Sequence, residues 1–255
     1  MVIWSGLIQN VAGVDSNVGF FFQGFKQNII SMIGVGWYAQ GEGVLNGIVT
    51  AINTIDETVT IEGSQNFRSG RSYTFTDTRL FTPCFKRGTK LLCLKNDKEE
   101  YVLIEDIKKG DLIKTLYHGY VKTDIIGSSS MFNENSNIRH SKKMYKCPKT
   151  NFPELLEDLY LTGGHCLLVD NLSKQQEELT IKFVKNIKKT DDKYNLMAFI
   201  DYRVELCQDE QIFCIYHIAL EHDDVSANYG IYANGLLVES CSKKCMLETT
   251  MDTKL

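Results

Sequence analysis

The sequence predicts an all-β protein, and two features of the chain support this. Short runs of β-branched and aromatic residues recur along it, and Gly, Asn, Asp and Ser separate them at close spacing. Only 3 prolines are present, which leaves no Pro-rich linker or collagen-like segment. Of the 255 residues 43% are hydrophobic and 24% are charged, so the chain can bury a core and is not generally disordered.

Residues 1–83 are predicted to form a small β-rich module of their own. Val49, Ile52, Val59 and Ile61 lie in β-rich runs on either side of residues 53–57, which predicts a hairpin. Residues 71–81 continue with β-branched and aromatic residues and predict a further strand. The turns between these strands are supplied by Gly, Asn and Ser.

Residues 18–38 are the most apolar stretch, interrupted by polar and charged residues between positions 23 and 28. Their apolar residues fall near helical spacing, which favours a helix packed on its own module: Phe22, Phe25, Ile29, Ile30 and Ile33. A helix that faces a lipid surface or a partner protein is the alternative, and membrane contact is the weaker form of it.

From Cys84 onward the pattern changes to many short strands. Residues 84–94 predict one strand, and residues 101–115 predict two more around a turn at 109–111. Residues 171–180 form a polar excursion, and residues 242–255 are expected to be a polar tail. The other β-like runs lie at 159–170, 181–187, 194–200, 202–207, 211–221 and 229–240.

Charge and cysteine content exclude several classes of protein. The net charge is -4, with 28 basic and 32 acidic residues, which argues against a nucleic-acid-binding protein. The 8 cysteines are too sparse for a disulfide scaffold and lack paired C-x2-C spacing, so no metal site is expected. The N-terminus lacks the pattern of a secretory signal, and no run of about 18 apolar residues occurs. An intracellular, cytoplasmic protein is therefore expected.

Three segments carry residues suited to chemistry. They are Cys84 in TPCFKRGT, Thr162 and His165 in LTGGHCLL, and Cys241 in LLVESC. Each is weak alone, because a lone cysteine is most often a small buried residue and a lone histidine in a β protein is most often structural. Their order along the chain makes the combination specific.

Together these segments resemble the Hint family, the self-processing fold of hedgehog C-terminal domains and inteins. The resemblance runs from Cys84 to Cys241 and includes Cys84-Phe85 with Gly88-Thr89, then residues 103–115, 161–169, 215–221 and 229–241. It implies a horseshoe-like β fold with pseudo-two-fold symmetry over residues 84–241, whose two ends meet at Cys84. It also implies that residues 1–83 are an extein-like flanking module.

The resemblance implies a thiol-initiated reaction that needs no metal or organic cofactor. A cysteine thiolate is a strong nucleophile, and Cys84 can attack the carbonyl of Pro83 to convert the amide into a thioester. In the family, residues at the positions of Thr162 and His165 assist this step, and Cys241 occupies the place of an acceptor nucleophile. Glycines at 163 and 164 let the backbone approach closely, and Asn234-Gly235 predicts a tight turn that returns the last strand toward Cys84.

Three positions depart from the family pattern. Glu239-Ser240 replace the His-Asn pair that ends splicing inteins, so asparagine cyclisation is impossible there and N-terminal cleavage without splicing is predicted. His217 follows Tyr216 where an Asp is usual, and His217 can serve as a proton shuttle. Pro83 at the scissile bond is a hindered, conformationally fixed acyl donor, which predicts slow or absent cleavage.

An inactive Hint fold that serves as a structural or interaction protein is the alternative. In that case residues 1–83 bind protein partners. The composition, rich in Asn, Lys and Ile, is similar to that of large DNA viruses of protists, where free-standing Hint proteins occur. This raises a virion component, such as a minor capsid protein, as the alternative function.

Overall fold

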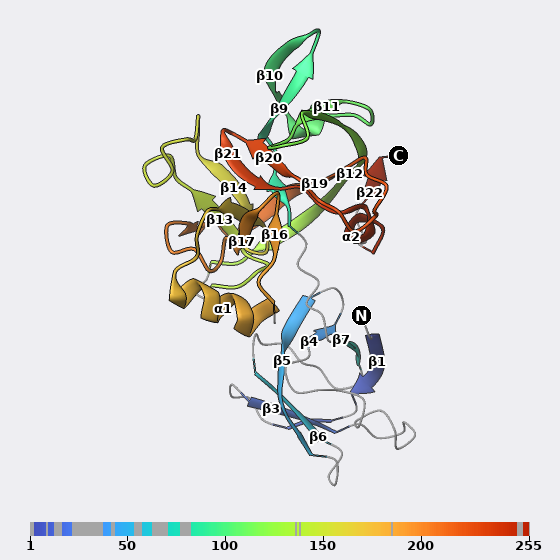
Figure 1. The fold of residues 1–255 in the computed structure, drawn as a ribbon. Helices are drawn as coiled ribbons and strands as arrows, with labels where there is room; N and C mark the ends of the chain where they lie inside the picture. Colours follow the sequence, from blue (N-terminus) through green and yellow to red (C-terminus); the bar gives the residue numbers. More distant parts are fainter. Residues whose placement is uncertain are drawn as a thin grey trace. The chain divides into compact units, whose positions relative to one another are not determined.

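The computed structural model describes residues 83–135, 137, 139–184, 186–248 and 252–254, together with the backbone of the strands that precede residue 83. The chain divides into two compact units, Met1–Leu80 and Phe81–Leu255 (Figure 1). Strands dominate the described part of both units, which confirms the predicted all-β class.

The first unit contains an antiparallel sheet in the order β1-β7-β4-β5-β6-β3-β2. β5 and β6 pair from Asn53 and Thr58 onward, which confirms the predicted hairpin, and β7 begins where the strand over 71–81 was expected. The predicted helix over residues 18–38 is wrong at its start, since residues 17–21 form β3; residues 22–37 lie outside the described part. The strands are β1 Ile3–Ile8, β2 Asn10–Ala12, β3 Asn17–Phe21, β4 Tyr38–Gly41, β5 Val44–Asn53, β6 Thr58–Glu62 and β7 Arg71–Thr76.

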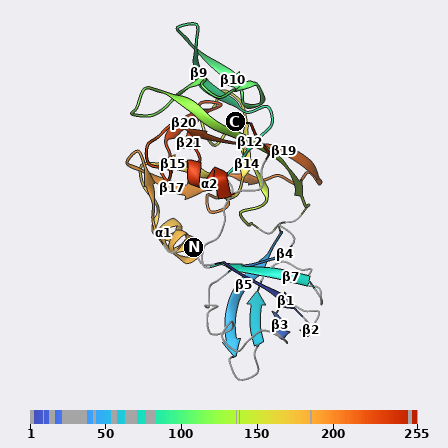
Figure 2. The same cartoon turned by 90° about the vertical axis from the view of Figure 1, so that its right-hand side faces the viewer.

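The second unit contains one long, continuous sheet whose strand ladders are all antiparallel. The β9–β10 hairpin projects from one end of this unit and α1 lies at the other (Figures 1 and 2). The strand order is β16-β17-β15-β21-β20-β9-β11-β12-β19-β8-β14-β13-β18, with β10 on β9 and β22 on β12. Its main apolar core draws residues from most of these strands.

The strands of the second unit have the following bounds: β8 Phe85–Lys86, β9 Lys90–Lys95, β10 Lys98–Leu103, β11 Leu112–Lys114, β12 Tyr120–Asn133, β13 Met144–Cys147, β14 Leu159–Thr162, β15 Cys166–Val169, β16 Lys189–Thr190, β17 Lys193–Met197, β18 Glu205–Leu206, β19 Gln211–Leu220, β20 Gly230–Ala233, β21 Leu236–Glu239 and β22 Asp252–Lys254. A short 3-10 helix, η2, covers Ile104–Asp106. The predicted pseudo-two-fold relation within this sheet stays a prediction.

A helix occupies much of the segment where a polar stretch at 171–180 and a β-like run at 181–187 were expected. Helix α1 spans Lys174–Val184. Ser173 caps it: its Oγ accepts the backbone N–H of Gln176 over 3.2 Å, and its own N–H donates to the Gln176 side chain over 2.9 Å. This reciprocal capping box satisfies two backbone donors and starts a helix despite the β-branched residues that follow.

The segment after Cys241 is folded in part, where a polar tail was expected. Helix α2 spans Lys243–Glu248 and packs on β12 and β19, and β22 pairs with β12. The Ser242 hydroxyl caps α2 by accepting the N–H of Cys245 over 3.2 Å. Met246 is buried with Ile125 and Ala219, so a single apolar residue anchors this otherwise polar segment.

The predicted Asn234-Gly235 turn is confirmed. It joins β20 to β21 with φ angles of 48° and 99°, the left-handed values that a two-residue hairpin turn requires. The turn returns the chain as β21, which also pairs with β15 at Val238 and Leu167. In the described part of the chain, no helix is long and apolar enough to cross a membrane.

Candidate active site

Cys84 and Thr162 are joined through their backbones and one side chain. The Cys84 N–H donates to Thr162 Oγ1 over 3.0 Å, and the Thr162 N–H donates to the Cys84 carbonyl over 2.9 Å. Both residues are buried. The Pro83–Cys84 peptide is therefore fixed on its nitrogen side by the first residue of the Thr-x-x-His segment.

The turn from Thr162 to His165 is closed tightly. The His165 N–H donates to the Thr162 carbonyl over 3.0 Å, and the Gly163 and Gly164 N–H groups each donate to a neighbouring loop carbonyl over 2.8 Å. A Cβ at Gly163 would lie 2.4 Å from the His140 oxygen and 2.5 Å from the Tyr145 ring. Only glycine permits this approach, as the sequence predicted for position 163.

His165 lies beside Cys84 and forms a hydrogen bond with β21. Its Nε2 lies 3.1 Å from the Glu239 carbonyl, which acts as the acceptor of an Nε2–H, and its ring centroid lies 4.2 Å from that of Phe85. Nδ1 has no hydrogen-bond partner among the described residues. Burial lowers the pKa of His165 to about 3, although the backbones of Glu239 and Cys84 oppose the shift. The imidazole is therefore neutral, with a lone pair on Nδ1.

The Cys84 thiol is enclosed and protonated. Its side chain has no solvent exposure, and burial raises the pKa of Cys84 far above its ordinary value of 9.0, with a smaller contribution from Cys245. Pro83 is also buried. The nucleophile and the acyl group that it would attack thus lie together in a space closed to water.

His217 and Cys241 complete the set of predicted site residues. β19 carries His217 opposite Gly127 of β12, and the Cys241 N–H donates to the Ile218 carbonyl over 2.8 Å. Burial, followed by the nearby His165, lowers the pKa of His217 well below its ordinary value. β8 also pairs with β19, so the two ends of the 84–241 region meet on this strand, as expected.

Glu239 and Cys245 also belong to the site, although the sequence predicted no role in the site for either. Glu239 was only a departure from the family pattern, and Cys245 was only part of the expected polar tail. The Glu239 carboxylate accepts the Cys166 N–H over 3.1 Å and the Asn195 amide over 2.8 Å, and burial raises its pKa to about 7. Cys245 on α2 lies beside Cys241, with the two Sγ atoms within 4.8 Å of each other. The only feature of the sequence that pointed to Glu239 was an acidic residue within a buried β-like run, and no feature pointed to Cys245.

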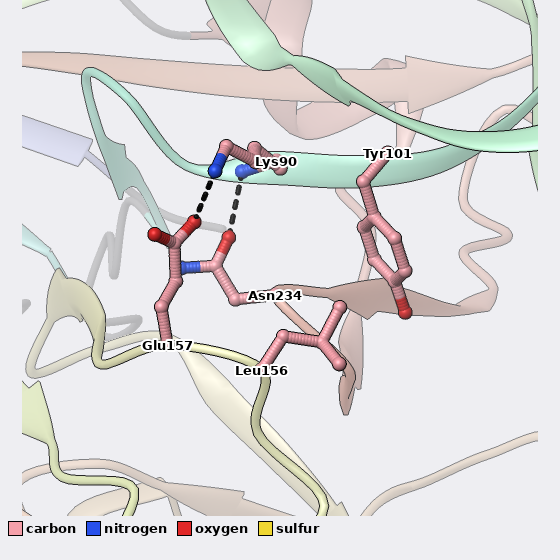
Figure 3. Close-up of a pocket in the computed structure, with 5 residues that line it drawn as sticks. All are labelled: Lys90, Tyr101, Leu156, Glu157 and Asn234. Atoms are coloured by element: carbon pink, nitrogen blue, oxygen red, sulfur yellow. Dashed lines mark hydrogen bonds and ion pairs between the residues drawn. The ribbon is translucent and has the colours of Figure 1, made fainter.

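A pocket elsewhere in the unit contains none of the predicted catalytic residues. It has a volume of about 340 Å³ and is lined by Lys90, Tyr101, Leu156, Glu157 and Asn234 (Figure 3). Lys90 donates its backbone N–H to Asn234 over 2.7 Å and pairs through Nζ with Glu157 at 2.8 Å. These bonds tie the Asn234-Gly235 turn to β9, which is a structural role.

The sequence matches no protein-family model and no curated protein. Among solved structures, the fold is similar to a DnaB intein from Synechocystis sp. PCC 6803. The match has 12% identity and a TM-score of 0.36, and it covers 62% of this chain and 99% of the intein.

Proposed function

We propose that this chain is a self-processing protein of the Hint type. In this proposal Cys84 converts the Pro83–Cys84 peptide bond into a thioester, and residues 1–83 are released without splicing. The observation that carries the proposal is the hydrogen bond from the Cys84 N–H to Thr162 Oγ1 over 3.0 Å. A hydroxyl both donates and accepts, so Thr162 can hold the departing nitrogen before and after it takes up a proton.

The acyl shift needs one proton relay. The thiol proton of Cys84 passes to Nδ1 of His165 as Sγ attacks the Pro83 carbonyl carbon. The bond from that carbon to the Cys84 nitrogen then breaks as the nitrogen takes the proton from His165. Pro83 is left in a thioester with Sγ and Cys84 has a free amino group, so no water is consumed in this step.

The electrostatics of the site predict that the acyl shift at Cys84 is slow. Burial raises the pKa of Cys84 and lowers that of His165, and both shifts oppose proton transfer from the thiol to the imidazole. Attack on the thioester by water or an added thiol then releases residues 1–83, whereas attack by Cys241 would move the acyl group to the Cys241 thiol and leave it attached to the chain. Glu239-Ser240 supply no asparagine for cyclisation, which supports cleavage as the end point.

The proposal is tested with the purified whole chain and a Cys84→Ala variant. Both are incubated with and without dithiothreitol, and their intact masses are followed over time. We expect the wild type to lose residues 1–83 faster with dithiothreitol and the variant to stay whole. Equal persistence of both chains would overturn the proposal.

A second candidate function is a non-cleaving structural or interaction protein. The complete burial of Cys84 favours it, because an enclosed, protonated thiol is unreactive. In that case residues 1–83 serve as a partner-binding module, as in a virion component. Presence of the uncleaved chain at fixed stoichiometry in purified particles would support this function over the first.

A further inference from the structure

Three side chains of types that bind metals converge from separate elements, and two of them belong to the candidate active site. They are His217 on β19, Cys241 just after β21, and Cys245 on α2. His217 offers one ring nitrogen and each cysteine its Sγ, and these three atoms lie within 4.8 Å of one another. The cluster extends beyond the Hint-like region, since Cys245 lies outside residues 84–241.

His217 supplies an independent sign that a ligand is missing. The side chain is only 1% exposed, and neither of its ring nitrogens has a hydrogen-bond partner among the described residues. An unsatisfied buried polar group destabilises a fold, so such groups call for a specific explanation. A cation bound to one ring nitrogen would satisfy it.

The local fold explains how the two sulfurs come together. Cys241 is fixed by its N–H bond to the Ile218 carbonyl, one residue from His217, and by a β-bridge to Ala219. Ser242 then caps α2, whose first turn carries Cys245. The four-residue spacing from 241 to 245 thus results from a strand end followed directly by a capped helix.

From this geometry we infer that His217, Cys241 and Cys245 bind a zinc-class divalent cation. Thiolate sulfur and imidazole nitrogen are the donor set that Zn²⁺ prefers, at about 2.3 Å and 2.0–2.1 Å respectively. Ligands at those bond lengths on a tetrahedron lie under about 4 Å apart, so side-chain shifts of about 1 Å close the cluster. Two thiolates neutralise the charge of the cation, and the fourth position is left for water.

The inference does not require cleavage at Cys84, and its test uses a separate readout. The whole chain is freed of metal, reduced with a phosphine and titrated with Co²⁺ and then Zn²⁺. We expect one equivalent of Co²⁺ to give a thiolate-to-metal charge-transfer band with tetrahedral d–d bands, and Zn²⁺ to displace it. Zn²⁺ should also raise the melting temperature in proportion to the logarithm of its concentration above Kd.

Matched variants identify the ligands. Cys241→Ser and Cys245→Ser should each weaken Co²⁺ affinity more than about tenfold, a loss that even outer-shell partners produce. Cys214→Ser, which removes another partly exposed thiol, should leave affinity unchanged. His217→Ala should abolish the tetrahedral spectrum. Absence of the charge-transfer band in the reduced wild type, or wild-type Co²⁺ affinity in both ligand-cysteine variants, would overturn the inference.

Discussion

The Cys84 N–H donates to Thr162 Oγ1 over 3.0 Å, although 78 residues separate the two along the chain. The sheet makes this contact by pairing β8 with β14, at Phe85 and Leu161. The nitrogen that would leave in an acyl shift is thus positioned by the segment that also carries His165. The predictions below follow from this relationship and from the burial around it.

Thr162→Val should both destabilise the chain and slow cleavage. Valine has nearly the shape of threonine but cannot accept the Cys84 N–H, which would be left buried and unpaired at a cost of about 1–3 kcal/mol. Thr162→Ser keeps the acceptor and is the matched control. Urea unfolding and the rate of thiol-induced cleavage check both effects. A Val variant that cleaves as fast as the Ser variant would rule out a role for this hydrogen bond.

His165→Gln should reduce the cleavage rate by about 10²–10⁴, the usual contribution of a general acid–base group. Glutamine can still donate to the Glu239 carbonyl, so the local structure is largely kept while the proton relay is lost. The measurement is the single-turnover rate in dithiothreitol, with circular dichroism to verify folding. A rate within threefold of wild type, in a folded variant, would exclude His165 from the relay.

Gly163→Ala should destabilise the second unit by about 1–3 kcal/mol, the usual cost of forced overpacking. The added Cβ would lie 2.4 Å from the His140 oxygen, and this backbone atom cannot move aside without shifting the loop. Gly119→Asn is the control, because no atom lies within 4 Å of the added Cβ and asparagine tolerates its φ of +66°. Thermal unfolding of both variants checks the prediction, and equal melting temperatures would contradict it.

Acid should destabilise the fold through its buried histidines. The pKa of His165 is about 3 and that of His217 is well below 6.5. Below pH 6.5 these two histidines therefore bind protons in the unfolded chain but not in the folded chain. The free energy of unfolding therefore falls as the pH drops through this range. Glu239 acts in the opposite sense: its pKa is raised from 4.5 to about 7, so the folded chain takes up a proton first.

Glu239→Gln should therefore steepen the loss of stability between pH 6.5 and 4.5, by up to about 1.4 kcal/mol per pH unit. Urea unfolding across this range measures the slope in wild type and variant. Glu210→Gln removes an exposed acid and should keep the wild-type slope. Identical slopes for all three chains would show that Glu239 does not titrate in the expected sense.

The β class could be predicted from the sequence because strand patterns are local signals. The approach of Cys84 to Thr162 and His165 was implied only by the resemblance to the Hint family, since it joins segments 78 residues apart. The Asn234-Gly235 turn could also be predicted, because its left-handed conformation depends on these two residues alone. α1 was missed because Ile181 and Val184 suggested a strand, while the Ser173–Gln176 capping box carried the stronger signal. α2 could not be predicted, since its place depends on the burial of Met246 by distant strands. The cluster of His217, Cys241 and Cys245 depends on the same packing, so the sequence did not predict it either.

Mass analysis of the N-terminal fragment released by hydroxylamine tests the central claim most directly. Hydroxylamine traps a thioester as a hydroxamate, so the account predicts a fragment that ends at Pro83 and carries this group. The Cys84→Ala chain should give no such fragment under the same conditions. Absence of this fragment from the wild type, or the same fragment from the variant, would contradict thioester formation at Cys84.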